Sequence, residues 1–315
     1  MRVWLLGTGG PELTKDRQGA ATLVEANGRL LLFDAGRGVL QRLFEVRSDI
    51  AKVSEVFLTH LHSDHIEGLP GLWMTGWFMC GRPIPLSVHG PSGTTAMLDG
   101  MQAMYGHDIV ARTSVSPKIN LTQINSHEFK EGTVFEADDI RVTAFEVEHC
   151  AGFPAYGFRV DANGIVLIIS GDTVYTESLV RHSKGASVVI HNVIAASDEY
   201  LNRVPSKRKI FDLLSLPESC AKVFMRVKPQ LAVYSHVIML GLSEDELIAR
   251  TRAAGWDGPL HVAKDRTMLD IYADGNVAVY RPGSLDDLPE LSSPHLAPFH
   301  TCDPIAGFVT GLRLG

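Results

Sequence analysis

The stretch Thr59-His60-Leu61-His62-Ser63-Asp64-His65 constrains this chain most, because four of its seven residues can bind a metal ion. An apolar run at 53–58 precedes it and predicts a buried strand, so the first two histidines are expected at the strand end, on one face. Gly, Leu and Pro at 68–70 follow, so the aspartate and the last histidine fall in a tight turn toward a helix. Crowded imidazoles and a carboxylate are poor core material unless something organises them. The spacing therefore predicts a metal site with two sets of ligands.

Composition narrows the class of protein. The chain has 315 residues, 45% of them hydrophobic, which is enough for one large or two ordinary domains. A net charge of −7 and the lack of a long Lys/Arg block make a polyanion such as RNA an unexpected partner. The four cysteines show no CxxC spacing, which is typical of reduced thiols. With no signal-peptide pattern and no long apolar segment, we expect a cytoplasmic protein without membrane contact.

Strand and helix signals alternate along the chain without an internal repeat or a low-complexity linker. Asn-Gly pairs mark two hairpins, at 21–33 and 156–170. We expect a single domain over 1–283 in two β-rich halves, 1–160 and 161–283, and a tail at 284–315 packed on the domain or on a partner subunit. Other strands are predicted at 53–58, 85–90, 140–149, 186–190, 230–235, 260–263 and 276–280, and helices at 38–46, 69–80, 94–105, 217–227 and 243–254.

Further histidines and aspartates follow predicted strands elsewhere in the chain. Because sites in layered α/β proteins are built at the carboxyl ends of strands, their recurrence there favours one metal centre over isolated turn residues. Asp34 fits a plain turn residue and a residue that supports the metal ligands equally well. The residues that follow strands in this way are His149, Asp172, His191 and His236.

These motifs together resemble the metallo-β-lactamase fold superfamily. The segments Leu32-Phe33-Asp34-Ala35-Gly36, Gly90-Pro91-Ser92-Gly93 and Ser170-Gly171-Asp172-Thr173, with the histidine motif, are most similar to its ribonuclease Z and arylsulfatase-like branch. The resemblance covers the chain from Gly7 to about Tyr280. It implies an α/β (α+β) fold, a four-layer αββα sandwich of two mixed β-sheets flanked by helices.

The resemblance also implies a ligand set. His60, His62 and His149 would bind one Zn²⁺; Asp64, His65 and His236 would bind the other, and Asp172 would bridge the two. Mn²⁺ or Fe are alternatives. A hydrolase of this kind uses a metal-bridging hydroxide as its nucleophile. We expect Asp64 and His191 to be catalytic, with a structural role for His191 at least equally consistent.

Two departures from the branch bear on the substrate. The stretch 211–218 has no histidine where ribonuclease Z-like proteins carry one to protonate the leaving group, and the basic segment Arg203–Lys209 is short. We therefore expect a small ester-like substrate, namely a carboxyl ester, lactone or sulfate ester, and a homodimer. An aromatic cluster beside the motif favours core or a dimer contact over a substrate pocket, but its closeness to the metal turn keeps the pocket open. The residues of the possible pocket are Trp73, Trp77, Tyr105, Phe153 and Tyr156.

Two alternatives remain open from the sequence. One is a phosphodiesterase or ribonuclease Z-like nuclease, or a promiscuous β-lactamase, which the branch resemblance favours. The other is a non-hydrolytic protein that uses the same scaffold for redox chemistry with iron, or only for binding.

Overall fold

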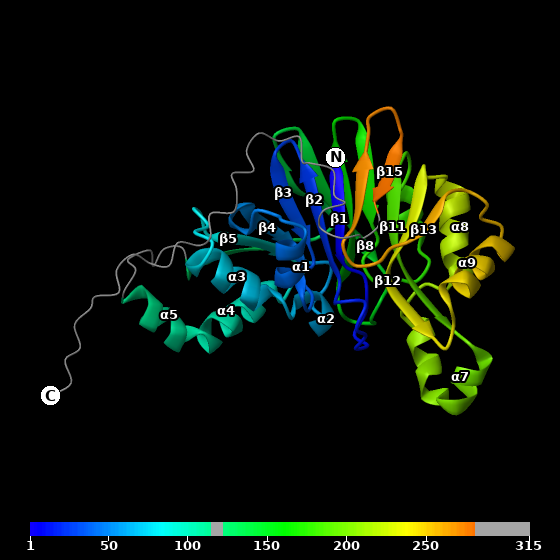
Figure 1. Cartoon of the computed structure of the whole chain (residues 1–315), viewed down its shortest axis with the longest axis horizontal. Coiled ribbons are helices and arrows are strands. Elements are labelled where there is room, and N and C mark those ends of the chain that lie inside the picture. Colours follow the sequence, from blue (N-terminus) through cyan, green and yellow to red (C-terminus); the bar gives the residue numbers. More distant parts are fainter. Residues whose placement is uncertain (115–121, 281–315) are drawn as a thin grey trace.

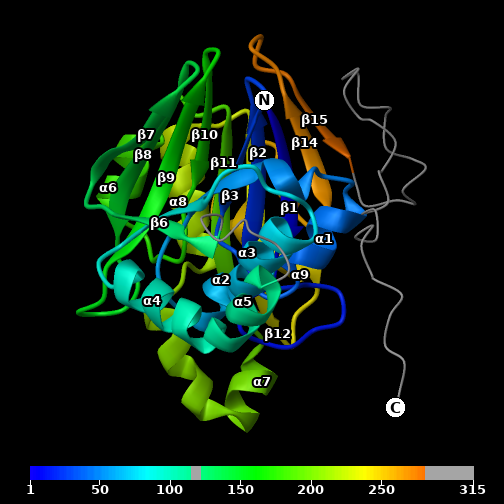
Figure 2. The same cartoon turned by 90° about the vertical axis from the view of Figure 1, so that its left-hand side faces the viewer.

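The computed structural model describes residues 1–114 and 122–280. Two mixed β-sheets pack face to face, and helices cover the outer face of each sheet, as Figures 1 and 2 show. This arrangement confirms the expected four-layer αββα sandwich of the α+β class.

The first sheet has the strand order β15-β14-β1-β2-β3-β4-β5-β6. The strands β3 to β6 run parallel, whereas β2 and β3 form the expected antiparallel hairpin across Asn27-Gly28. The strands are β1 (Arg2–Gly7), β2 (Ala21–Ala26), β3 (Arg29–Phe33), β4 (Val53–Phe57), β5 (Leu86–Gly90), β6 (Ile124–Glu128), β14 (Thr267–Ile271) and β15 (Val277–Tyr280).

The second sheet has the order β13-β12-β11-β10-β9-β8-β7, with β10 to β13 parallel. This sheet combines strands from both halves of the chain, because β7 and β8 come from the first half. The strands are β7 (Gly132–Ala137), β8 (Ile140–Val147), β9 (Ala155–Ala162), β10 (Ile165–Ile169), β11 (Val188–Ala196), β12 (Leu231–Leu240) and β13 (Leu260–Val262).

Helices complete the outer layers. Those between β3 and β6 lie against the first sheet, and α6, α8 and α9 lie against the second. The α-helices are α1 (Val39–Glu45), α2 (Ser63–Ile66), α3 (Leu69–Phe78), α4 (Thr94–Met104), α5 (Gly106–Thr113), α6 (Glu177–His182), α7 (Asp198–Arg203), α8 (Pro217–Val227) and α9 (Glu244–Ala253). The short 3-10 helices are η1 (Ile50–Lys52) and η3 (Pro205–Asp212).

Side-chain alternation along β1 shows how the layers form. Val3 and Leu5 point between the two sheets, whereas Trp4 and Leu6 point to the helix-covered face. All four side chains are buried. Because successive side chains in a strand face opposite sides, a continuous apolar run is what a strand between two cores requires. Complete burial of one such side chain contributes about 1.5–3 kcal/mol.

The structure extends two strands that the sequence predicts to be shorter. β11 continues to Ala196 and β12 to Leu240, so His191 and His236 lie inside strands and not at their ends. The apolar pattern predicted only the first part of each strand, because the polar histidine interrupts the apolar run and was taken as the end of the strand. The strand β14 was not predicted.

The expected division of the chain does not follow the architecture. The boundary between residues 160 and 161 falls inside β9, and both sheets take strands from both halves. The expected tail at 284–315 lies outside the described residues. Within the described parts of the chain, no helix has the length and apolarity needed to cross a bilayer.

Candidate metal centre

The histidine motif lies at the carboxyl end of β4, where the chain turns into α2. β4 ends at Phe57 and α2 begins at Ser63, so the residues between them form a short connection. His60 comes from this connection, and Asp64 and His65 come from the first turn of α2. All three residues are at most 5% exposed. The strand end and the helix thus present side chains toward two neighbouring points.

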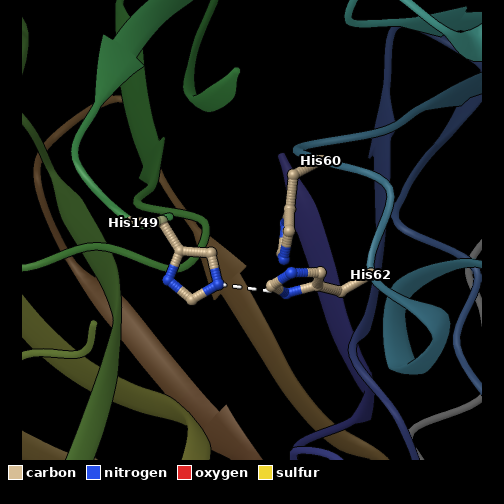
Figure 3. A group of neighbouring side chains, drawn as sticks. All are labelled: His60, His62 and His149. Atoms are coloured by element: carbon tan, nitrogen blue, oxygen red, sulfur yellow. Dashed lines mark hydrogen bonds between the residues drawn. The ribbon is translucent and has the colours of Figure 1, made fainter. Parts of the chain in front are cut away.

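Three imidazoles meet on the open side of the site (Figure 3). The rings of His62 and His149 have centroids 4.9 Å apart, and His149 Nε2 lies 3.1 Å from His62 Nδ1. His149 follows β8, and its Nδ1 donates a hydrogen bond to the carbonyl oxygen of Leu213 at 2.8 Å. That bond fixes the tautomer and leaves the lone pair of Nε2 for a metal. His62 is exposed, so this set, with His60, borders solvent.

Asp64, His65 and His236 form the second set, which is buried. His236 Nε2 lies 3.2 Å from Asp64 Oδ2, and His65 Nε2 lies 3.7 Å from the same oxygen. The backbone around Asp64 is crowded: a Cβ on Gly36 would lie 2.2 Å from the Asp64 carbonyl oxygen. Only glycine permits this approach, which holds the second set against the end of β3.

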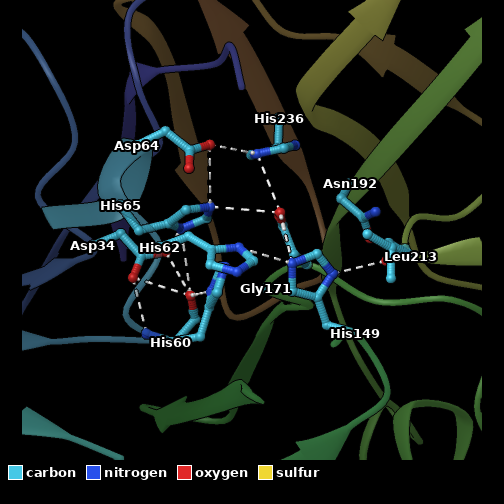
Figure 4. Close-up of polar contacts among 12 residues, drawn as sticks. Asp34, His60, His62, Asp64, His65, His149, Gly171, Asn192, Leu213 and His236 are labelled. Atoms are coloured by element: carbon cyan, nitrogen blue, oxygen red, sulfur yellow. Dashed lines mark hydrogen bonds and ion pairs between the residues drawn. The ribbon is translucent and has the colours of Figure 1, made fainter. Parts of the chain in front are cut away.

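Asp172 connects the two sets through its contacts with His65, His149 and His236, three side chains that Figure 4 labels. Its Oδ2 lies 3.2 Å from His236 Nε2, 3.6 Å from His65 Nε2 and 3.8 Å from His149 Nε2. The residue follows β10, after Gly171, whose φ of +61° favours glycine. A single carboxylate therefore faces imidazoles of both the open and the buried set.

Several atoms at the centre that could bind a metal have no hydrogen-bond partner among residues 1–114 and 122–280. His60 Nε2, His65 Nε2 and Asp172 Oδ1 are buried and make no hydrogen bond among the described residues. A buried polar atom without a partner costs about 1–3 kcal/mol, so a cluster of such atoms needs an explanation. Nitrogen ligands on one side, and mixed nitrogen and carboxylate ligands on the other, match the preferences of Zn²⁺ and similar ions. The residues present therefore fit a pair of metal ions.

The pKa values of the neighbouring histidines His60 and His65 are shifted in opposite directions. Burial and the adjacent imidazoles lower the pKa of His60 well below its usual value. Burial also opposes a charge on His65, but the Asp34 and Asp172 carboxylates outweigh it and raise the pKa of His65 well above its usual value. Burial alone would raise the pKa of Asp172, yet His236 and His65 hold it well below the usual range. The centre thus keeps its carboxylates ionised, as metal binding requires.

Asp34 lies behind His65, at the end of β3. Its Oδ2 is 2.8 Å from His65 Nδ1, and its Oδ1 accepts a hydrogen bond from the Thr59 amide at 2.8 Å. Thr59 Oγ1 donates to the same carboxylate and lies 3.0 Å from His60 Nδ1. Asp34 thereby orients one histidine directly and another through Thr59. Sequence reasoning missed Thr59, although it directly precedes the motif, and the Leu213 carbonyl, for which no sequence signal exists.

A β-bulge directs His236 into the centre. The pairing of β11 with β12 shifts after Asn192 and Ser235, which leaves His236 as an extra residue. Its φ is +46°, in the left-handed region that is unfavourable for a residue with a Cβ. A bulge re-aims a side chain without ending the strand, so this histidine reaches the site from a strand interior.

His191 does not join the ligand cluster. It is fully buried on β11, and its Nδ1 donates to the Asn192 carbonyl oxygen at 2.8 Å. Its ring borders a cavity of about 30 Å³ behind the centre, which Asp172 and His236 also line. That volume holds about one or two water molecules and no substrate. The expected catalytic role of His191 therefore has no support in its position.

Most of the aromatic residues expected around a substrate pocket lie in the core. Trp73 has no exposed surface, and its Nε1 donates to the Thr122 carbonyl oxygen at 3.2 Å. Trp77 and Tyr156 are 4% exposed, and Tyr105 packs edge-to-face on Trp73. Trp73 and Trp77 of α3 pack in the cluster between the first sheet and its covering helices, and Tyr156 of β9 packs between the two sheets. Phe153 differs, since it is 73% exposed and lies four residues after His149.

The sequence is similar to one family model and to ribonuclease Z proteins of mycobacteria. The sequence model of a family described as Anti-Pycsar protein Apyc1 matches residues 1–228. A ribonuclease Z of Mycobacterium marinum is 34% identical over 279 residues, which cover 87% of this chain and 99% of that protein. A ribonuclease Z of Mycobacterium bovis is 32% identical over 280 residues, covering 86% and 99%.

Solved structures agree on the fold. The metallo-β-lactamase fold protein YhfI of Bacillus subtilis superposes with a TM-score of 0.67 at 17% identity, covering 85% of this chain and 98% of that one. The short form of human tRNase Z superposes with a TM-score of 0.63 at 22% identity, covering 86% and 100%. The chain is therefore a metal-dependent hydrolase that belongs to the metallo-β-lactamase fold superfamily, and within it to the family of the anti-Pycsar protein Apyc1 and of the ribonuclease Z homologues.

Proposed function

We propose that this protein is a two-metal phosphodiesterase that cleaves RNA in the manner of ribonuclease Z. The observation that carries the proposal is the juxtaposition of two ligand sets around Asp172 in a chain that is 34% identical to a ribonuclease Z along nearly its whole length. Phosphodiester cleavage is chemistry for which two-metal centres are suited, because one centre can stabilise both the attacking and the leaving oxygen.

We assign the ligands as follows. His60, His62 and His149 hold one ion; Asp64, His65 and His236 hold the other, and Asp172 is shared by both. Zn²⁺ is the proposed metal, because imidazole and carboxylate ligands of this number suit it. When bound, two such ions supply Lewis-acid polarisation of a phosphoryl oxygen and a lowered pKa for a coordinated water.

The remaining roles, which are to orient the ligands, the attacking water and the substrate, belong to groups of the protein itself. The Leu213 carbonyl and Asp34 hold the rings of His149 and His65 in the orientation that binding needs. Asp64 is the carboxylate of the buried set, and we propose that it helps to orient the attacking water. His62 and Phe153 are exposed, and we propose that the substrate approaches the centre from their side. No histidine occurs at 211–218, so the proton for the leaving oxygen is proposed to come from solvent.

The proposal departs from the expected small ester-like substrate. The relatives support the phosphodiester alternative and lend no support to a carboxyl ester, lactone or sulfate ester. For the same reason nucleic acid becomes the proposed partner, although net charge argued against a polyanion. The relatives are hydrolases by name, which also disfavours the redox alternative with iron.

A second candidate is a phosphodiesterase for a small phosphodiester. The family model that matches residues 1–228 carries a description other than ribonuclease Z, and the basic segment Arg203–Lys209 is short for an RNA-binding arm. Both candidates use the same centre and differ only in the size of the substrate.

One substrate panel tests the proposal. Bis-p-nitrophenyl phosphate, precursor tRNA, and chromogenic carboxyl ester, lactone, sulfate and β-lactam substrates are offered to the protein with Zn²⁺ or Mn²⁺. We expect cleavage of the phosphodiester and of the RNA. Cleavage of bis-p-nitrophenyl phosphate without cleavage of RNA would select the second candidate. Turnover of an ester or sulfate alone would contradict both.

Location and assembly are part of the proposal. We infer a cytoplasmic protein, because Cys150 and Cys220 form no disulfide with another described residue. We also propose a single domain over 1–283 and a homodimer. Light scattering after size-exclusion chromatography measures the mass in solution, and a monomer across micromolar concentrations would contradict the dimer.

A further inference from the structure

We propose that Asp265 is a positioning residue for His236, and that it acts through the turn Gly7–Gly10. The inference rests on the proposed function, because it assigns His236 to a metal ion. Asp265 lies in the connection between β13 and β14 and belongs to no ligand set. Three linked observations carry the inference. They are a buried carboxylate with four hydrogen bonds, a buried guanidinium beside it, and a turn that contacts the His236 ring and the amide of the following residue, Val237.

The Asp265 carboxylate is 4% exposed and accepts hydrogen bonds from both sides of the N-terminal loop. Its Oδ1 accepts from the Thr8 amide and from Thr8 Oγ1, each at 2.9 Å. Its Oδ2 accepts from the Gln18 amide at 2.8 Å and from Arg42 Nε at 3.0 Å. One carboxylate thus holds the two ends of the loop 8–18 together. Charge-assisted bonds of this kind are roughly twice as strong as neutral ones.

Arg17 strengthens the same junction. Its side chain is 7% exposed, and it donates to Thr8 Oγ1 at 2.7 Å, to the Ala263 carbonyl oxygen, and to Glu244 Oε1 at 3.1 Å. Burial lowers the pKa of Arg17, while the Glu244 and Asp265 carboxylates oppose that change. A buried charge that loses its partner is strongly destabilising. The loop is therefore held by charges that are satisfied only in this arrangement.

The turn reaches His236 by two routes. The Thr8 carbonyl oxygen accepts a hydrogen bond from the Val237 amide at 2.8 Å, directly after the bulged histidine. A Cβ on Gly10 would lie 2.9 Å from His236 Cε1, so the backbone of the turn packs against the imidazole itself. The positive φ of His236 is intrinsically unfavourable and persists because the surroundings fix it. The turn supplies part of those surroundings.

These contacts give Asp265 a selective effect. His236 belongs to the buried set, whereas the open set of His60, His62 and His149 makes no contact with the turn that the structure records. Loss of the Asp265 charge should therefore weaken metal binding at the buried set and leave the open set unchanged. Partners that orient ligands typically alter metal affinity by about 10- to 100-fold.

The test measures the two metal affinities separately. Metal-free protein is titrated with Zn²⁺ in competition with a chromogenic chelator, and the His62→Ala variant identifies the step that belongs to the open set. We expect Asp265→Asn to weaken the buried-set step by about 10- to 100-fold. Asp270→Asn is the matched control, because Asp270 lies on β14 and pairs with Arg2, at 2.7 Å, away from the turn. It should leave both steps unchanged.

A second variant keeps the test decisive if Asp265→Asn does not fold. Gly10→Ala inserts a methyl group against the His236 ring and should weaken Zn²⁺ binding at the buried set. Thr8→Val removes the hydroxyl that bonds Asp265 and should weaken the same step, whereas Thr8→Ser keeps the hydroxyl and should bind as the wild type does. Equal weakening of both steps, or wild-type affinities in folded Asp265→Asn, would overturn the role of Asp265. A wild-type protein that binds fewer than two ions would instead overturn the proposed function and, with it, this role.

Discussion

The open and the buried ligand sets are held in different ways. His62 is exposed, and His149 is oriented by a backbone carbonyl from a distant loop. Asp64, His65 and His236 are at most 5% exposed, and carboxylates, close glycines and a β-bulge surround them. Of the open set, His62 alone is exposed, whereas every member of the buried set is enclosed. Changes in the buried set should cost folding stability as well as activity, whereas a change at the exposed His62 should cost activity alone.

The largest effect is expected where the two sets meet. Asp172→Ala removes the carboxylate that faces both, so bound metal and phosphodiesterase activity should be lost together, with a fall in turnover of about a thousandfold or more. Metal analysis and bis-p-nitrophenyl phosphate hydrolysis on the same sample measure this. Asp172→Asn keeps the shape and should still lose most activity. Wild-type turnover in Asp172→Ala would contradict the assignment of a shared ligand.

Asp34→Ala tests the buried side. The change leaves His65 Nδ1 and the Thr59 amide without their partner in a buried position. Each unsatisfied group costs about 1–3 kcal/mol, so the free energy of unfolding should fall by a few kcal/mol, along with activity. Urea unfolding and hydrolysis rates are the measurements. Asp257→Ala, at an exposed residue, is a control that should leave both unchanged. Full stability with lost activity would contradict the account of the buried set.

His62→Ala tests the open side. This exposed imidazole makes no contact that supports the core, so the free energy of unfolding of the metal-free protein should change by less than about 0.5 kcal/mol. Activity should nevertheless fall by at least about tenfold, because one ion loses a ligand. Unfolding curves of the metal-free chain and steady-state rates measure the two quantities. A large loss of stability would remove the distinction between the two sets.

The buried His191 should make the free energy of unfolding depend on pH. Burial lowers the pKa of His191 from 6.5 to about 4. Between these values the unfolded chain binds a proton that the folded chain does not, so stability falls as pH drops from 6.5 toward 4. The difference amounts to up to about 3 kcal/mol at 1.36 kcal/mol per unit. His191→Gln should flatten this part of the stability profile, measured by urea unfolding at pH 7, 5.5 and 4.5. An unchanged slope would show that the ring does not stay neutral.

The smallest effect is expected on the lobe formed by α7 and η3, which projects past the end of the sandwich where α2 lies (Figure 1). η3 ends one residue before Leu213, whose carbonyl holds His149. Arg208→Glu and Lys209→Glu should weaken cleavage of RNA and reduce its salt dependence by about one logarithmic slope unit per lost phosphate contact. Hydrolysis of bis-p-nitrophenyl phosphate should not change. Equal effects on both substrates would contradict a contact with the RNA backbone.

Much of the fold, and the position of the His60–His65 motif, could be predicted from the sequence. The His60–His65 spacing and the apolar strand before it predicted the turn into α2, because strand period and ligand chemistry act locally. His236 was placed at a strand end because the bulge that admits it has no sequence signal. The aromatic residues of α3 were ambiguous, since a large apolar side chain beside a site is compatible with core and with pocket. The Leu213 carbonyl and the Asp265 junction depend on long-range backbone contacts that no local pattern encodes.

The most direct test of the two-set centre is a stepwise metal titration of the metal-free chain, with bound Zn²⁺ and bis-p-nitrophenyl phosphate hydrolysis followed together. The account predicts that two equivalents bind per chain and that activity appears only as the second is taken up, because both sets act on one phosphodiester. Full activity at one equivalent, or binding of fewer than two ions, would contradict it.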